Sequence, residues 1–216
     1  MTLDLELKVL GQKIQLRDIH SRKIYEFFVN KLQDFYDLKI KDDQSNFEHT
    51  EEEIKEIFGR LRTTTLLSKH REFQYMLLHG VIYTKKHLLR FGFVGNALCS
   101  FCNQETETYK HIFLKCKKVE DIWRALITYY DLMEIQDINW EDIFLGLPGR
   151  SVRIKFVNSL IIMMKYVIFK SRGTGILPSF NMVKKRIDEN IEAEKKLATS
   201  RGKLGVHLMK WEYAIQ

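Results

Sequence analysis

The sequence predicts a mainly α-helical protein, built from one medium or two small domains, with a β-hairpin expected at the N-terminus. Three observations lead to this class. Apolar residues recur at helical spacing in most segments of the 216-residue chain. The chain has only two prolines and 11 glycines, which is unlike β-sandwich or collagen-like sequences. Its hydrophobic content is 45%, which provides enough apolar surface for a folded core and excludes wholesale disorder.

The N-terminal segment predicts a hairpin followed by a helix. Apolar and charged residues alternate from Leu3 to Val9, Gly11 and Gln12 can form a turn, and alternation resumes at Ile14. From His20 to Leu38 the apolar residues return to helical spacing, and residues 39–49 are polar and expected to form a loop.

Three short amphipathic helices are predicted next. Thr50 to Glu53 fits a capping box that opens a helix with its apolar face at Ile54, Ile57, Phe58 and Leu61. The spacing of apolar residues predicts a second helix over 73–81. Thr84 is expected to cap a third over 85–91, which Gly92 ends.

The C-terminal half predicts four further helices. The first runs over about 108–132, and Pro148-Gly149 then breaks the chain. Ser151 is expected to cap a strongly apolar helix to Phe169, the most buried element. Ser179 starts a charged amphipathic helix through Ile191, and a last short helix is expected to bury Leu204, Leu208 and Trp211.

The charge distribution divides the chain near residue 63. Residues 1–63 carry 11 basic and 13 acidic residues, whereas residues 64–216 carry 24 basic and 15 acidic ones. A net charge of +9 on the second part suits a polyanionic partner.

Targeting signals are not apparent in this sequence. The first nine residues lack the apolar region of a signal peptide. The longest apolar stretch, 156–169, is too short to span a bilayer and contains Asn158, Ser159 and Lys165. We therefore expect an intracellular protein, nuclear or cytoplasmic, that is neither secreted nor membrane-bound.

All three cysteines fall in one 18-residue window with the pattern C-x2-C-x8-H-x4-C, formed by Cys99, Cys102, His111 and Cys116. An odd number of cysteines has no complete disulfide pairing, so a disulfide scaffold is not expected. Three thiolates and one imidazole are a ligand set that structural zinc prefers. Four protein ligands leave no position for a reactive water, so we expect one structural Zn²⁺ ion in a small helical domain around this CCHC knuckle.

The spacing of the last two ligands sets a geometric condition. Five residues along an α-helix correspond to roughly 500° of rotation, which leaves His111 and Cys116 about 140° apart. Both cannot reach one ion from a regular helix. A tightened turn or a helix end must therefore lie between them.

Basic residues gather around this motif. Residues 85–118 contain seven Lys or Arg and two acidic residues, a net charge of +5. Phe101, Tyr109 and Phe113 lie among them, where they could either stack on bases or pack around the metal loop. The expected nucleic-acid-binding residues are Lys85, Lys86, Arg90, Lys110, Lys115, Lys117 and Lys118.

One enzymatic alternative shares two of the cysteines. His70 and Glu72 form an H-x-E pattern upstream of Cys99 and Cys102, as in zinc nucleobase deaminases. Against it, Leu98 stands where those enzymes have proline, the intervening segment predicts helices, and His111 and Cys116 would have no role. The sequence also shows no phosphate-binding loop, nucleophile elbow, polymerase aspartate pair or endonuclease motif, so no enzymatic activity is expected.

Several of these motifs together resemble a known domain. They are Phe73-Gln-Tyr-Met-Leu-Leu-His79, Thr84 to Gly92, Cys99-x2-Cys102, Glu105-Thr106, His111-Ile-Phe113, Cys116 and Trp123. This series resembles the zinc-binding C-terminal domain of reverse transcriptases from non-LTR (LINE-type) retrotransposons. It is specific over roughly residues 70–125, and Tyr75 and Met76 depart from the tryptophan and lysine usual there. The resemblance implies that residues 1–63, with the hairpin and helices, link to the missing polymerase. It also implies that residues 64–132 form the reverse-transcriptase-type zinc-binding domain and that residues 133–216 are a C-terminal helical extension.

The resemblance implies a non-catalytic module that helps hold template RNA or target DNA during target-primed reverse transcription. The implied partners are RNA or single-stranded DNA, and the polymerase domain of the same element. The alternative is a structural zinc module that only docks onto that polymerase. It predicts an exposed apolar patch, which we would expect on the 156–169 helix.

Overall fold

The structure is a computed structural model that describes residues 6–9, 12–15, 50–132, 134 and 139–214. The chain divides into two compact units, residues 1–38 and 39–216, which are described separately. In the first unit, strands β1 (Glu6–Val9) and β2 (Gln12–Gln15) pair antiparallel, with Glu6 opposite Gln15. The helix predicted over 20–38 and the loop predicted over 39–49 lie outside the described residues.

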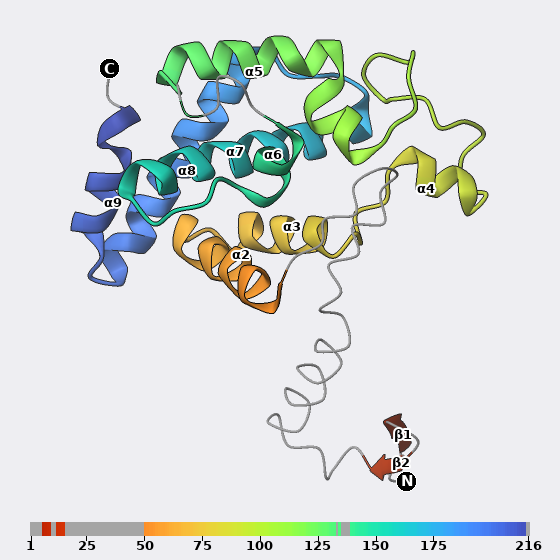
Figure 1. Cartoon of the computed structure of the whole chain (residues 1–216), viewed down its shortest axis with the longest axis horizontal. Coiled ribbons are helices and arrows are strands. Elements are labelled where there is room, and N and C mark those ends of the chain that lie inside the picture. Colours follow the sequence, from red (N-terminus) through yellow and green to blue (C-terminus); the bar gives the residue numbers. More distant parts are fainter. Residues whose placement is uncertain (1–5, 10–11, 16–49, 133, 135–138, 215–216) are drawn as a thin grey trace, which may run out of the picture. The chain divides into compact units, whose positions relative to one another are not determined.

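The second unit is helical (Figure 1). Its elements in chain order are α2 (Glu51–Thr64), α3 (Ser68–Leu78), α4 (Lys85–Arg90), the π-helical turn η2 (His111–Lys115), α5 (Lys117–Tyr130), α6 (Trp140–Leu145), α7 (Val152–Ser171), the 3-10 turn η4 (Arg172–Thr174), α8 (Phe180–Ser200), α9 (Leu204–Trp211) and the 3-10 turn η5 (Glu212–Ala214). The mainly α fold class is confirmed. The segment boundaries at residues 63 and 132 stay a prediction.

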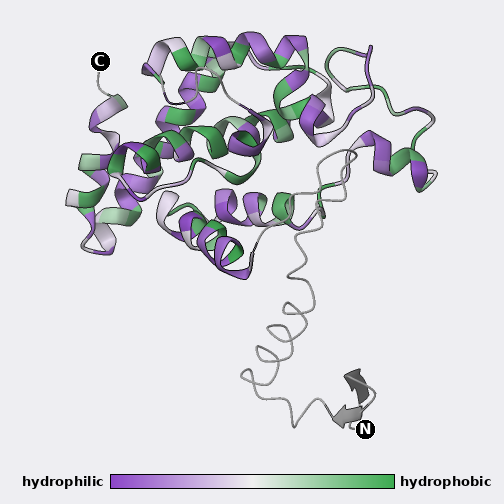
Figure 2. Ribbon diagram, in the orientation of Figure 1, coloured by the Kyte–Doolittle hydropathy of each residue, from purple (hydrophilic) through white to green (hydrophobic). Residues whose placement is uncertain are grey.

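Helix α7 is the core of this unit, as the sequence predicts. It contacts α2, α3, α8 and α9, and it lies between α5 and the α2–α3 pair in Figure 1. Twelve of its 20 residues are buried, and it is largely green in the hydropathy colouring of Figure 2. The exposed apolar patch expected on this helix is therefore wrong, because its apolar side chains already have partners within the fold.

The predicted helix starts are confirmed by their hydrogen bonds. Thr50 and Glu53 form a complete capping box at α2. The Ser151 hydroxyl accepts from the backbone N–H of Ile154 at 3.1 Å, and Ser179 caps α8 in the same way. These bonds satisfy amide groups that a helix N-terminus leaves without internal partners.

Two expectations about the C-terminal half need correction. The helix predicted over 108–132 is interrupted at Cys116, whose extended backbone separates η2 from α5. In α9, Leu208 is 52% exposed, whereas His207, Lys210 and Trp211 are buried. The helix turns this face inward because Lys210 has an anionic partner in the core.

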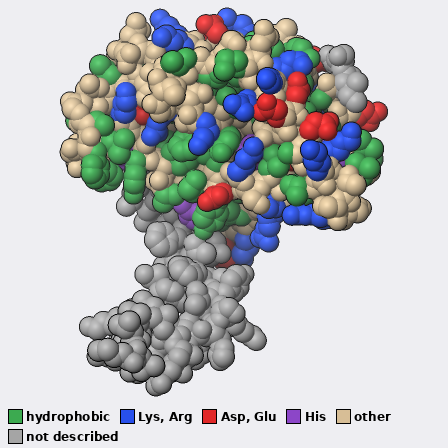
Figure 3. All heavy atoms as spheres, turned by 180° about the vertical axis from the view of Figure 1, so that it is seen from behind, with side chains coloured by type: hydrophobic (Ala, Val, Ile, Leu, Met, Phe, Trp, Pro, Cys, Tyr) green, Lys and Arg blue, Asp and Glu red, His purple; other side chains and the backbone are tan. Residues whose placement is uncertain are grey.

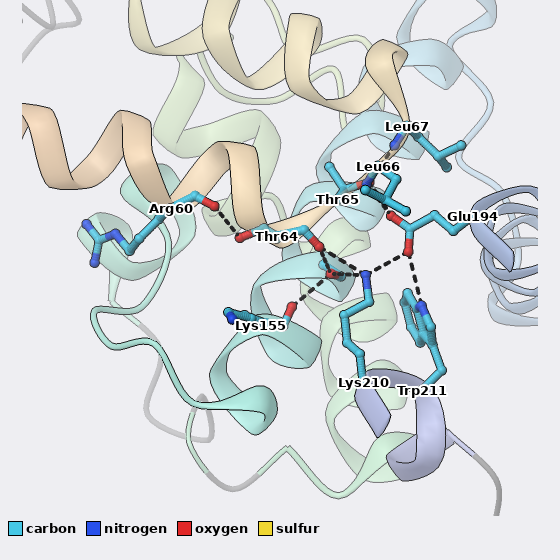
Figure 4. A network of polar contacts seen from close by, with 10 residues as sticks. Arg60, Thr64, Thr65, Leu66, Leu67, Lys155, Glu194, Lys210 and Trp211 are labelled. Carbon is cyan, nitrogen blue, oxygen red and sulfur yellow. Dashed lines mark hydrogen bonds and ion pairs between the residues drawn. The ribbon is translucent and has the colours of Figure 1, made fainter. Parts of the chain in front are cut away.

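That partner is Glu194 of α8, the centre of the polar network in Figure 4. Its carboxylate lies 2.6 Å from Lys210 Nζ and also accepts from the Trp211 indole, the Thr65 hydroxyl and the backbone N–H of Leu66. Burial alone would raise the pKa of Glu194, but Lys210 and these donors hold it below its usual value. The network fastens α8 and α9 to the segment that joins α2 to α3.

None of the helices in the described ranges combines the length and the hydropathy needed to cross a bilayer.

Candidate metal centre

Cys99, Cys102, His111 and Cys116 come together in the structure. One potential ligand atom from each residue lies within 4.8 Å of all the others. The Sγ atoms of Cys99 and Cys116 are 4.0 Å apart, and Cys102 Sγ is 3.4 Å from His111 Nε2. A tetrahedral zinc ion with Zn–S bonds of about 2.3 Å places neighbouring sulfurs about 3.8 Å apart. The cluster is therefore compatible with one Zn²⁺ ion, and all three cysteines are free of disulfides.

A short hairpin supplies the first two sulfurs. The backbone N–H of Cys99 donates to the carbonyl of Glu105, and that of Asn103 donates to the carbonyl of Cys99. Asn103 adopts a left-handed backbone with φ of 54°, a conformation that asparagine tolerates better than most residues. The resulting tight turn lets both cysteines of the C-x2-C pair face the same point.

The last two ligands are brought together by the π-turn η2. The backbone N–H of Cys116 donates to the carbonyl oxygen of His111 at 2.8 Å, closing a turn five residues long. Cys116 itself has an extended backbone with ψ of 121°. The predicted interruption of the regular helix between His111 and Cys116 is therefore confirmed. The expectation of a tightened turn is wrong, because the turn is widened and ends at the cysteine.

Cys116 also stands at the N-terminus of α5, a position that favours a thiolate. Burial raises the pKa of Cys116, while the backbone N–H groups of Lys118 and Val119 act in the opposite direction. For Cys102, burial is outweighed by backbone donors from Gln104 and Glu105 and by His111, and its pKa falls to about 6. Amides directed at sulfur would stabilise the deprotonated ligands that zinc requires.

Glu105 orients the histidine. His111 is 5% exposed, and its Nδ1 lies 3.4 Å from Glu105 Oε2, while Nε2 faces the sulfurs. A carboxylate behind a metal-binding imidazole fixes the tautomer and the ring orientation. Glu105 therefore supports Nε2 as the ligand atom.

Glu107 is a structural residue that the sequence analysis counted only as a charge. It is fully buried, and one oxygen accepts from the backbone N–H and the hydroxyl of Ser100, at 2.9 and 2.7 Å. Its other oxygen accepts from the backbone N–H of Lys85, at the start of α4. Arg172 Nε lies 3.7 Å from the same oxygen. Glu107 thus joins the knuckle, α4 and the end of α7.

The turn η4, which follows α7, approaches the knuckle closely. A Cβ atom at Gly175 would lie 3.2 Å from the carbonyl oxygen of Ser100, and Gly175 has a φ of +68°. The Arg172 guanidinium donates to the carbonyl of Tyr83 as well as facing Glu107. The metal centre is therefore packed against the central helix as well as along its own loop.

The aromatic residues within the motif form the frame of this centre. Phe101, Tyr109 and Phe113 are each at most 2% exposed, so stacking of these three rings on bases is excluded. Phe113 packs edge-on against Phe73 of α3, and the Trp123 indole donates to the carbonyl of Phe113 within the π-turn. Of the two roles considered for these rings, the structure assigns packing around the metal loop.

The deaminase alternative requires His70 as a zinc ligand beside Cys99 and Cys102, and the structure does not place it there. His70 is absent from the cluster and lies fully buried against the Tyr166 ring of α7, with ring centroids 5.0 Å apart. Neither of its nitrogens has a hydrogen-bond partner. An H-x-E pattern here belongs to a core helix.

The basic residues of the motif occupy two places. Lys110, Lys115 and Lys117 are exposed around η2 and the first turn of α5. Lys118 is exposed too, but its Nζ donates to the carbonyl of Phe101 at 2.7 Å, so it also stabilises the knuckle. On α4, Arg90 is exposed, and Lys85 and Lys86 are half-buried.

Comparison with known proteins agrees with the geometry of the centre. Residues 40–123 match the family model described as zinc-binding in reverse transcriptase. No curated protein matches the chain. The match and the single Cys3His cluster of the described residues support a zinc-binding, reverse-transcriptase-associated domain, and the cluster is compatible with one zinc site.

Proposed function

We propose that this chain is the non-catalytic C-terminal module of a LINE-type retrotransposon reverse transcriptase, which contacts nucleic acid during target-primed reverse transcription. Zinc, held by Cys99, Cys102, His111 and Cys116, would fix the fold of the knuckle. The matched family is an accessory zinc-binding domain of reverse transcriptases, which supports this role. The module would act inside the cell, in the nucleus or the cytoplasm.

A structural role for zinc follows from the donor set. Three thiolates and one imidazole complete a tetrahedral shell and leave no site for water or substrate. The described residues contain no second group of potential ligands. Bound zinc would therefore cross-link the four ligand residues and would not take part in catalysis. The exposed lysine side chains would make the contacts to phosphate.

The observation that carries the proposal is the exposure of cations around a rigid metal loop. Lys110, Lys115 and Lys117 reach solvent from backbone that the cluster holds in place. Figure 3 shows Lys and Arg side chains distributed over the rear face of the molecule. Such cations bind the phosphate backbone with little sequence preference and with strong salt dependence.

The experiment is a salt titration of RNA binding by fluorescence anisotropy with the zinc-loaded chain. Lys115→Glu/Lys117→Glu should weaken binding about tenfold or more and flatten the salt dependence, because each lost phosphate contact lowers the slope by roughly 0.7 on single strands. The matched control, Lys185→Glu/Lys196→Glu, makes the same charge change at exposed positions of α8. If both variants weaken binding equally, only net charge matters. If the native chain binds no RNA or single-stranded DNA at low salt, the proposal is wrong.

A docking role is the second candidate, and exposed apolar residues on α9 favour it. Val206, Leu208 and Met209 are each more than half exposed. If this helix docks onto the polymerase domain of the same element, Val206→Lys/Met209→Lys should abolish co-purification with that domain. RNA binding by the isolated chain should then remain unchanged.

A further inference from the structure

An exposed aromatic surface lies beside the metal centre, at the two ends of α4. We call the rings of Tyr83, Phe91 and Phe93 the aromatic shelf. They are 47%, 44% and 77% exposed, respectively, although aromatic side chains of this size usually contribute to a core. The ring centroids of Tyr83 and Phe91 are 5.3 Å apart, and those of Phe91 and Phe93 are 6.5 Å apart.

The backbone holds these rings outward. Gly92 has a φ of +76°, and the N–H groups of Gly92 and Phe93 donate to the carbonyls of Leu89 and Leu88. This pair of bonds is a Schellman motif, in which the residue after the glycine often folds back onto the helix. Phe93 remains largely in solvent, so its ring does not serve this packing.

The other end of the shelf is tied to the knuckle. The Tyr83 carbonyl accepts from Arg172, and the following helix begins at Lys85, whose N–H donates to Glu107. Glu107 in turn binds Ser100, between the first two cysteines. The shelf is therefore positioned by the same contacts that position the metal loop.

The electrostatic surroundings of the shelf suit a polyanion. The 32 residues from Phe73 to Gln104 include no aspartate or glutamate, and they include Lys85, Lys86 and Arg90. The Arg90 guanidinium lies 5.1 Å from the centre of the Phe91 ring. Aromatic faces next to cations form the surface on which single-stranded nucleic acid binds, with bases on the rings and phosphates at the cations. An apolar protein partner would gain nothing from this charge.

From these observations we infer that the aromatic shelf binds single-stranded nucleic acid by stacking on unpaired bases. This inference rests on the proposed function and adds a preference for single strands over duplexes. In a duplex the base faces are already stacked on their neighbours, so the shelf can bind it only through phosphates. Phe93, the most exposed ring, should contribute the most.

The test compares Phe93→Leu with Phe93→Tyr in the full zinc-loaded chain. The probes are a fluorescein-labelled 12-nucleotide oligouridine and a duplex RNA of the same length. Leucine keeps an apolar side chain but removes the π face, whereas tyrosine keeps it. Phe93→Leu should weaken oligouridine binding about tenfold, while Phe93→Tyr stays near the native affinity and duplex binding changes less than about twofold. Met182→Ala on α8, also a largely exposed side chain, is the control.

The outcomes separate this inference from the proposed function. If the Lys115/Lys117 double variant loses oligouridine binding and Phe93→Leu does not, the stacking inference is wrong and the proposed function stands. If Phe93→Leu weakens the oligouridine and the duplex equally, the shelf does not recognise unpaired bases, which also overturns the inference. A native chain that binds neither probe overturns both. A shelf used for self-association would appear as a change in sedimentation of Phe93→Leu with unchanged oligouridine binding.

Discussion

The backbone N–H of Cys116 donates to the carbonyl oxygen of His111 at 2.8 Å, and this one bond brings two metal ligands of unfavourable spacing to the same side of the chain. A π-turn lacks the regular hydrogen-bond pattern of an α-helix and rarely persists without other support. Zinc and this turn should therefore stabilise each other.

Zinc removal should loosen the knuckle before the core. Chelation at neutral pH should increase amide hydrogen exchange over residues 97–119, because the four ligands would no longer be linked. The amides of α7 should remain protected, since its core contacts with α2, α3, α8 and α9 do not involve the metal. Exchange followed by mass spectrometry measures both regions in one sample. Equal loosening of α7 would mean that the metal holds the whole fold.

Glu107→Ala should destabilise the zinc-loaded chain by about 3 kcal/mol, because it leaves buried donors of Ser100 and Lys85 without acceptors. Glu107→Gln keeps one acceptor oxygen, so its stability should fall between that of the native chain and that of Glu107→Ala. Glu192→Gln on α8 is the control, since that side chain is exposed and away from the metal centre. Urea unfolding at constant zinc compares the three variants, and an Ala variant as stable as Glu192→Gln would contradict the bridging role.

Gly175→Ala and Gly202→Ala form a matched pair. Both glycines have positive φ, +68° and +66°, so alanine costs about 1 kcal/mol of backbone strain at each. Only at Gly175 would the new methyl group meet the Ser100 carbonyl. Gly175→Ala should therefore be the more destabilising and should also weaken zinc binding in a competition with a chelator. Identical losses would show that the approach of η4 to the knuckle has no energetic consequence.

Acid should destabilise the fold through His70. Burial lowers the pKa of His70 from 6.5 to about 4, with a further lowering from Lys69 and an opposing effect of Glu194. Because folding favours the neutral ring, its contribution is complete above pH 6.5 and is lost as the pH falls toward 4, at most about 3 kcal/mol. His70→Phe keeps an aromatic ring against Tyr166 and should flatten this part of the pH profile. A profile unchanged by the substitution would assign the acid sensitivity elsewhere.

Local features were predictable from sequence. The caps at Thr50, Ser151 and Ser179 depend on residues three positions apart, and the ligand pattern depends on a fixed spacing. The break before Cys116 followed from helix geometry alone. Each of these requires only knowledge of neighbouring residues.

Features that depend on distant partners were not predictable. Glu107 reads as an ordinary charge until Ser100, Lys85 and Arg172 surround it. In α9 the apolar pattern suggested Leu208 for the core, but the buried pair of Lys210 and Glu194 turns another face inward. Helical spacing cannot tell which face an ion pair will hold.

The exposure of aromatic side chains was another feature that could not be predicted from the sequence. Phe101, Tyr109 and Phe113 lie closest in sequence to the lysines of the motif, yet the metal loop buries all three. Phe91 and Phe93 flank Gly92, which ends α4 and leaves their rings in solvent. The aromatic residues closest in sequence to the metal ligands are therefore packed around the metal loop, and those that flank Gly92 are accessible to solvent.

The most direct test of the account is the zinc content of three purified chains, measured by mass spectrometry of the metal and by chelator competition. The native chain should hold one zinc ion per molecule, His111→Ala should lose most of it, and His70→Ala should keep it even though burial makes that position sensitive for stability. Loss of zinc from His70→Ala with retention in His111→Ala, or a native chain without zinc, would contradict the assignment of the centre.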